Sequence, residues 1–406
     1  MSQTSESLYA RIRQEVAARA DRLWEVSLAL HRDPETAYEE HRAARLLAGE
    51  LEREGFEVQR GVAGLPTAFV ARTGSAVSAR EGAAREGPSV ALLMEYDALP
   101  LLGHACGHNL IAAAGLGAAL ALRAALGVVE GALLAVGTPA EERGGGKVAE
   151  VAAGLFEGVD AALMFHPGVH DWTWAPLTAS AQVRVGFHGR AAHPTGSPTE
   201  GIDALGALIQ LFNTLGVLSR RLPMGSHIQG IVTEGGRATN LVPAYAEGLF
   251  GLRGETTSAL ERLVEELRSC AQGVALATRT GVEVTDVGGR YEHFRDNEVL
   301  STLFAGHLDR AGIRLSEPTA GVYLGSSDIG NVSTRVPGIH PWIAIMGPEA
   351  SDHTPEFAEA AAGPRARRVM CAAAEALACT AADVLLRPDV REQAWDRLRA
   401  KAAAGR

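Results

Sequence analysis

The sequence predicts an α/β fold in which a mixed, largely parallel β-sheet is flanked by helices, with a smaller α+β domain inserted into the larger one. The first observation is a set of short apolar runs separated by helical segments, which is typical of parallel sheets with helices on both faces. The second is a change in the pattern of apolar and polar residues between residues 180 and 290. We therefore expect residues 179–291 to interrupt a larger domain formed by residues 1–178 and 292–406.

The larger domain begins with two predicted helices, at 5–31 and 37–55, whose apolar residues recur three and four positions apart. Short strands are expected at 56–60 and 67–72, and the stretch 74–88 has the composition of an exposed loop. Four apolar runs are expected as buried strands of one sheet. They are Val90–Met94, Leu133–Val136, Ala162–Phe165 and Trp342–Met346.

The inserted domain has the predicted order β-α-β-β-α-β, typical of a four-stranded antiparallel, ferredoxin-like sheet with two helices. Ser197 as N-cap, Pro198 in the first turn and Glu200 three residues after the cap predict where its first helix begins. The elements are expected at 181–188, 198–219, 227–233, 243–253, 257–277 and 281–287.

The composition excludes several classes of protein. The chain has 406 residues, of which 47% are apolar, enough for two domains with full cores. Its formal net charge is −10 without a Lys/Arg cluster, so we expect no nucleic-acid partner. The polar residues 1–13 do not resemble a signal peptide, and we expect no membrane span. Four cysteines are too few for a disulfide scaffold, which favours a cytoplasmic protein.

Each of the four apolar runs is followed within about seven residues by an acidic residue or a histidine. In an α/β sheet, sites form at the carboxyl ends of the strands, so we expect these side chains to meet at one edge. The first run leads to Asp97, Cys106 and His108, the second to Glu141 and Glu142, the third to His166 and the fourth to His353.

Cys106 and His108 lie in the loop Gly103–Asn109 and are two residues apart, so in extended backbone they point the same way. Thiolate and imidazole are good ligands for zinc-like metals. Asn109 is a candidate cap for the helix that follows. Taken alone, the loop also fits a hydrogen-bonded turn histidine beside a buried cysteine.

Glu141 and Glu142 are adjacent carboxylates that would repel each other unless a cation lies between them or they face different partners. One can bind a metal while the other accepts a proton; the alternative is a solvated helix start. The next stretch, Gly144–Lys147, lacks the pattern of a phosphate loop and predicts a flexible loop beside the site. Across the chain, five candidate ligands are too many for one tetrahedral zinc and suit two metals.

The chain resembles the aminoacylase and glutamate-carboxypeptidase family of dinuclear metallopeptidases. It is most similar to the branch of auxin-conjugate amidohydrolases and p-aminobenzoyl-glutamate hydrolase. Glu95 departs from the family, because many members have a ligand histidine there, and auxin-conjugate enzymes usually have Asp in place of Asn109. The matching stretches span nearly the whole chain: Tyr96–Pro100, Gly103–Asn109, Pro139–Glu142, Gly189–Pro194, Gly235–Pro243, Ser327–Ser333 and His353.

The resemblance implies a zinc-peptidase-like catalytic domain, an inserted lid domain that forms a homodimer, and two divalent metal ions per subunit. Zinc suits the thiolate best, with manganese, cobalt or nickel as alternatives. Cys106 is the implied bridging ligand, and the other implied ligands are His108, Glu142, His166 and His353.

The resemblance also implies the roles of other residues. Glu141 is the implied general base and Asp97 the residue that orients a ligand imidazole. His193 is implied to stabilise the oxyanion in the partner subunit's site. Asn240 and Arg253 correspond to residues that bind the substrate carboxylate.

Together these observations predict a metal-dependent amidohydrolase. Its expected substrate is a small molecule with a free carboxylate: an N-acyl amino acid, a p-aminobenzoyl-glutamate conjugate or a small dipeptide. The alternatives are an exopeptidase that trims longer peptides, or a non-catalytic protein that kept the fold and its metals.

Overall fold

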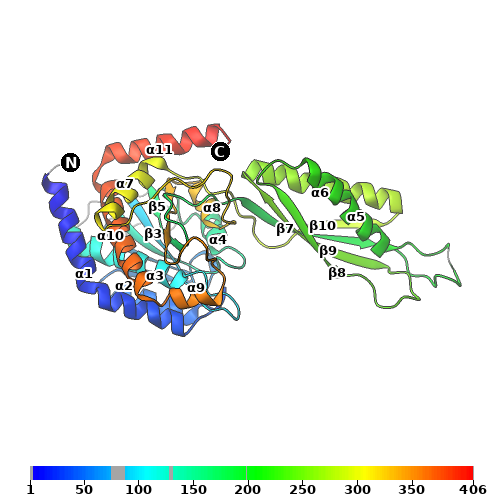
Figure 1. Ribbon diagram of the computed structural model, residues 1–406, viewed down its shortest axis with the longest axis horizontal. Helices are drawn as coiled ribbons and strands as arrows, with labels where there is room; N and C mark the ends of the chain where they lie inside the picture. Colours follow the sequence, from blue (N-terminus) through cyan, green and yellow to red (C-terminus); the bar gives the residue numbers. More distant parts are fainter. Residues whose placement is uncertain (1–2, 75–86, 128–130, 198, 406) are drawn as a thin grey trace.

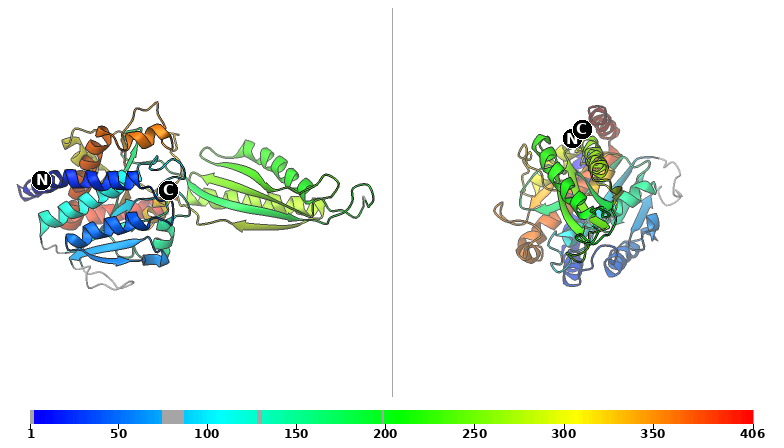
Figure 2. Two further views of the ribbon diagram at one scale, coloured as in Figure 1. Left: turned by 90° about the horizontal axis from the view of Figure 1, so that it is seen from below. Right: turned by 90° about the vertical axis from the view of Figure 1, so that its right-hand side faces the viewer.

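The computed structural model describes residues 3–74, 87–127, 131–197 and 199–405. Figure 1 shows a larger body, rich in helices, and a narrower one that extends from it. The left view in Figure 2 shows the same arrangement from below, and in the right view the narrower body lies in front of the larger one. Most of the loop expected at 74–88 lies outside the described residues, as does Pro198.

The larger body is built on a six-stranded sheet in the order β1-β2-β4-β3-β5-β11. The strands from β4 to β11 run parallel, and β1 and β2 add an antiparallel edge. Every residue of β3 and β4 is buried, as their continuous apolar runs predict. The bounds are β1 (Glu57–Arg60), β2 (Phe69–Gly74), β3 (Ser89–Glu95), β4 (Ala132–Thr138), β5 (Ala161–Leu163) and β11 (Gly338–Ile339).

The fourth apolar run does not join this sheet, so that prediction was wrong. Its strand, β12 (Trp342–Ala344), pairs in parallel with β6 (His166–Gly168) in a separate two-stranded sheet. The pairing of β6 with β12 has the same residue register as the pairing of β5 with β11. Pro341, which has no N–H to donate, lies between β11 and β12 and interrupts the ladder.

Helices cover the sheet. α1 (Gln3–Arg32), α3 (His108–Leu126) and α10 (Pro364–Leu386) pack against one another, and α3 and α10 also pack on β3. α3 and α10 are long and apolar enough to cross a membrane by length and composition, but 83% of each apolar window is buried. The remaining helices of this body are α2 (His41–Arg53), α4 (Gly146–Ala152), α7 (Glu298–Arg310), α8 (Ile329–Ser333), α9 (Pro355–Ala360) and α11 (Pro388–Ala403).

The narrower body is an antiparallel sheet in the order β10-β7-β9-β8 with two helices, which is the predicted β-α-β-β-α-β arrangement. It has a hydrophobic core of its own. The bounds are β7 (Ala179–His188), α5 (Ala204–Leu218), β8 (His227–Glu234), β9 (Tyr245–Gly254), α6 (Thr257–Thr278) and β10 (Gly281–Asp286).

The predicted start of the first helix in this body was wrong. α5 begins at Ala204, and its N-cap is Asp203, whose side chain accepts a hydrogen bond from the Gly206 N–H. The preceding residues are held in extended backbone because Arg190 and Ile202 exchange two backbone hydrogen bonds of 2.9 Å. Tertiary pairing therefore outweighs the local capping pattern at Ser197.

Candidate metal centre

The side chains expected to bind metal come from the carboxyl ends of the strands. Cys106 lies in the loop after β3, and His108 is the first residue of α3. Glu142 follows β4, His166 begins β6, and His353 lies in the loop before α9. The backbone N–H of His353 donates to the carbonyl of Ala105 at 2.9 Å, which joins the last of these loops to the first.

Gly107 makes the close approach of these segments possible. It is the N-cap of α3 and has φ +80°, a conformation that side chains disfavour. A Cβ at this position would lie 2.5 Å from Pro167, next to His166. The expectation that Asn109 caps this helix was wrong: Asn109 is buried, and its amide donates to the Ser27 hydroxyl and to the Ala361 carbonyl.

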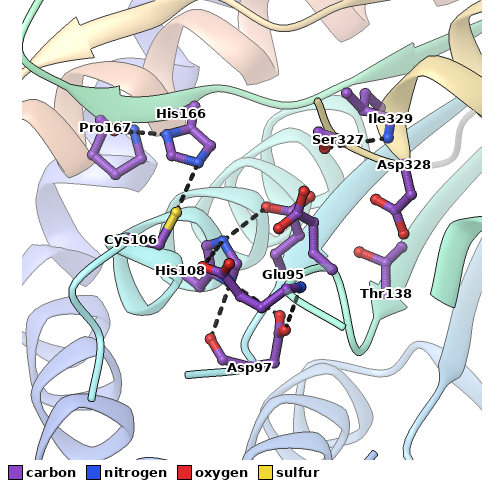
Figure 3. A network of polar contacts seen from close by, with 12 residues as sticks. Glu95, Asp97, Cys106, His108, Thr138, His166, Pro167, Ser327, Asp328 and Ile329 are labelled. Carbon is purple, nitrogen blue, oxygen red and sulfur yellow. Dashed lines mark hydrogen bonds and ion pairs between the residues drawn. The ribbon is translucent and has the colours of Figure 1, made fainter. Parts of the chain in front are cut away.

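The five predicted ligands converge. Figure 3 shows Cys106 and His166 facing each other, with 3.4 Å between the Cys106 Sγ and the His166 Nε2. The Glu142 Oε1 lies 3.9 Å from the His108 Nε2 and 3.6 Å from the His353 Nε2. Three overlapping groups have ligand atoms within 4.8 Å of one another: Cys106–His108–His166, Cys106–Glu142–His353 and His108–Glu141–Glu142.

Asp97 holds two of these ligands at once. Its Oδ1 accepts a hydrogen bond of 3.0 Å from the His108 Nδ1, and its Oδ2 accepts one of 2.9 Å from the Glu142 backbone N–H. The His108 ring is therefore fixed with its Nε2 facing the other ligands. This is the geometry expected of a residue that orients a ligand imidazole.

A strained turn presents Glu141. Ala140 has φ +59°, which is unusual for a residue other than glycine. The buried Glu40 holds it there by accepting a 2.8 Å hydrogen bond from the Ala140 N–H. On the other side, the hydroxyl of Tyr291 donates to the Glu141 carbonyl at 2.8 Å. These contacts leave the Glu141 side chain beside Glu142.

Glu141, Glu142 and His353 line a cavity of about 940 Å³ that lies between the two bodies. Arg253, from β9, lines the same cavity, and its guanidinium donates to the Ser326 hydroxyl at 2.6 Å. His193 and Asn240 are exposed and are not among the residues that line this cavity in the described part of the chain. Of the predicted substrate-binding and oxyanion residues, the fold thus brings only Arg253 to the cavity that the candidate ligands Glu142 and His353 line in its own chain.

The sequence model of Peptidase family M20/M25/M40 matches residues 94–376 of the chain, which includes all of these site residues. The chain belongs to this family. It is accordingly a hydrolase of the M20 peptidase family, as its residues predict.

Relatives of the M20 hydrolase agree with this assignment. An Xaa-Arg dipeptidase of Mus musculus is 38% identical over 401 residues, which cover 95% of this chain and 91% of the relative. One of the subunits of p-aminobenzoyl-glutamate hydrolase from Escherichia coli is 34% identical over 67% of this chain and 57% of its own length. A dinuclear metal-binding peptidase of the M20 family from Bacillus subtilis shares the fold, with a TM-score of 0.69 at 22% identity over 91% of this chain and 99% of its own.

The residues of this M20 hydrolase fit the two metal ions that are bound by such relatives. Buried polar atoms without a hydrogen-bond partner among the described residues include the His108 Nε2 and the Glu142 Oε1. Burial raises the pKa of Cys106 well above its ordinary range. Burial and the charges of Glu95 and Glu142 do the same to the pKa of Glu141. Burial thus disfavours the charged forms of Cys106 and Glu141, which divalent cations would stabilise.

Sequence reasoning missed a buried ion-pair network beside the ligands. Lys147, expected in a flexible loop, is a fully buried residue of α4. Its ammonium donates to the Glu95 Oε1 at 2.5 Å and to the Asp328 Oδ1 at 2.7 Å. The signal for this network is weak in the sequence, because its three members are far apart along the chain.

Proposed function

We propose that this hydrolase cleaves the amide bond of a small dipeptide that has a free carboxylate, using two bound divalent metal ions. Dipeptides ending in arginine are the first substrates to test, because an Xaa-Arg dipeptidase matches almost the whole chain. p-Aminobenzoyl-glutamate and N-acyl amino acids are the next. The observation that carries the proposal is the convergence of five metal-ligand side chains and Glu141 at a cavity that also contains Arg253.

The ligands of the two ions would be Cys106, His108, Glu142, His166 and His353. Cys106 shares one ligand group with His108 and His166 and another with Glu142 and His353, which supports a bridging role for its thiolate. When bound, the ions polarise the scissile carbonyl and lower the pKa of the attacking water. The thiolate ligand favours zinc, with manganese, cobalt or nickel as alternatives.

Glu141 would be the general base. Its carboxylate takes a proton from the attacking water and returns that proton to the leaving amine. A raised pKa, caused mainly by burial, suits a carboxyl group that must both accept and donate a proton. Arg253 would bind the free carboxylate of the substrate from the other side of the cavity.

We further propose that the narrower body is a lid that forms a homodimer and that His193 acts in the partner subunit's site. His193 Nδ1 accepts hydrogen bonds from the Thr195 and Gly196 N–H groups, so the neutral ring carries its proton on Nε2. That proton is then available to donate to a developing oxyanion. On the edge strand β8, Ile231 and Val232 are 62% and 49% exposed, which supports pairing of this strand with a second copy.

We also propose a role for Asn240. This residue, which is exposed on the lid, would contact the substrate carboxylate in the partner's site together with that site's Arg253.

A cytoplasmic location is proposed because all four cysteines are free, and the Cys106 thiolate must stay reduced to bind metal.

The replacement Glu141→Gln tests the proposed reaction. We expect kcat on a cleaved dipeptide to fall by at least about 10²–10⁴-fold, because the amide cannot take the proton of the attacking water. Metal content, measured by elemental analysis, should stay at the wild-type value because Glu142 still binds. Substrates of increasing length, all ending in the same residue, separate a dipeptidase from an exopeptidase. Undiminished turnover by the variant would contradict the role of Glu141.

A further inference from the structure

Glu95 faces the metal ligands with one of its two carboxylate oxygens. It is the last residue of β3 and is 1% exposed. Its Oε1 accepts the hydrogen bond from Lys147, whereas its Oε2 has no hydrogen-bond partner among the described residues. The Oε2 lies 3.5 Å from the Nε2 of His108. Figure 3 shows Glu95 beside His108 at the centre of the site.

The atoms around the His108 Nε2 form an unsatisfied group. The Nδ1 of His108 is occupied by Asp97, so its Nε2 is the atom left to bind a metal. The Glu142 Oε1, 3.9 Å from the same Nε2, likewise lacks a hydrogen-bond partner within the described ranges. The carboxylate oxygens of Glu95 and Glu142 thus each lie within 4 Å of the His108 Nε2, and all three are buried polar atoms without a hydrogen-bond partner among the described residues. A cation bound by the His108 Nε2 would give these oxygens a partner.

The spacing agrees with shared coordination. Oxygen and nitrogen ligands lie about 2.1 Å from zinc, so two ligands in tetrahedral geometry are about 3.4 Å apart. The 3.5 Å between the Glu95 Oε2 and the His108 Nε2 is close to this value. The 3.9 Å between the His108 Nε2 and the Glu142 Oε1 is slightly longer, so these two side chains would move closer together on binding. We propose that Glu95 is a further ligand of the metal ion held by His108 and Glu142, which rests on the proposed function.

Lys147 and Asp328 hold Glu95 in position for this role. The ammonium of Lys147 lies between the two carboxylates, and its backbone N–H donates to the Asp328 Oδ2 at 2.9 Å. Each of the three side chains is at most 1% exposed. Two carboxylates and one ammonium leave a net charge of −1, which the metal ion balances. Lys147 and Asp328 are thus positioning residues, and Glu95 is the residue that contacts the ion.

A crystal structure of the zinc-loaded wild-type enzyme tests the inference directly, with the ions located by anomalous scattering. We expect a Glu95 oxygen about 2.0–2.2 Å from one of the two ions. Two bound ions with both Glu95 oxygens beyond about 3 Å from each would overturn the inference and leave the proposed function intact. Failure of the wild-type enzyme to bind any ion would instead remove the proposed function itself.

The replacement Glu95→Gln gives an independent test, with Glu150→Gln as matched control. Glu150 is also fully buried on α4, three residues after Lys147, and neither of its oxygens has a hydrogen-bond partner in the described part of the chain. Zinc affinity is measured by competition with a chromophoric chelator, and the cobalt-loaded enzymes are compared by their absorption spectra. We expect Glu95→Gln to weaken one of the two sites at least about 10-fold and to change the cobalt spectrum.

The control variant should keep both wild-type affinities and the wild-type spectrum. Unchanged binding and an unchanged spectrum in Glu95→Gln would contradict the inference, even if that variant had lost activity. If Glu95→Gln does not fold, the distance in the zinc-loaded wild-type crystal decides the question alone.

Discussion

At the scale of single residues, the site depends on side chains that hold the ligands as much as on the ligands themselves. Asp97 illustrates this, because its two oxygens accept from the His108 ring and from the Glu142 backbone. An asparagine has one acceptor oxygen in place of two and cannot make both bonds. We expect Asp97→Asn to lower zinc affinity by about 10–100-fold in a chelator competition.

Asp160→Asn is the matched control for this prediction. Asp160 also accepts from a backbone N–H, that of Ser89 at 2.8 Å, and from the indole of Trp395, at the opposite end of β3. The control should lose stability in thermal unfolding but retain metal affinity. Equal zinc affinities for Asp97→Asn and the wild-type protein would show that Asp97 does not orient the ligands.

The convergence of the five candidate ligands could be predicted from the sequence because each lies beyond a buried apolar run whose strand is paired in parallel. Lys147 could not be predicted in the same way. It follows three glycines, which favours a loop, and it is buried only because Glu95 and Asp328, 52 and 181 residues away, pair with its charge. The general rule that lysine is exposed fails where two carboxylates are already buried.

At the scale of elements, strong apolar periodicity predicted the helices and strands, and their limits depended on contacts distant in sequence. The six elements of the narrower body all lie close to their predicted places. Two errors have physical causes. α5 begins only after Asp203 because extended pairing of Arg190 with Ile202 occupies the residues before it. The run at Trp342 leaves the main sheet because Pro341 cannot donate to the ladder.

At the scale of the whole molecule, the proposed dimer predicts that two inactive variants restore activity when they are combined in one dimer. If His193 completes the partner's site, then Glu141→Gln and His193→Ala chains should each be inactive as pure dimers. A mixed dimer would have one site with both residues intact. Co-expression at equal levels should therefore restore about a quarter of wild-type activity, since half of the dimers are mixed and half of their sites are complete.

Purification of the mixed dimer through two different tags provides the control, because it confirms that the two variants are together. Activity that stays at the level of the single variants in such a preparation would show that His193 does not act across the interface.

The central claim is that this M20 hydrolase needs two metal ions to cleave a dipeptide. The proposed ligands of these ions are Cys106, His108, Glu142, His166 and His353. The most direct test removes all metal with a chelator and then titrates zinc back while hydrolysis of an Xaa-Arg dipeptide is followed. We predict no activity without metal and full activity at about two ions per chain, with both ions lost from the triple variant of Cys106, His108 and Glu142. Undiminished hydrolysis by the metal-free enzyme, or no binding of zinc by the wild-type chain, would contradict the claim.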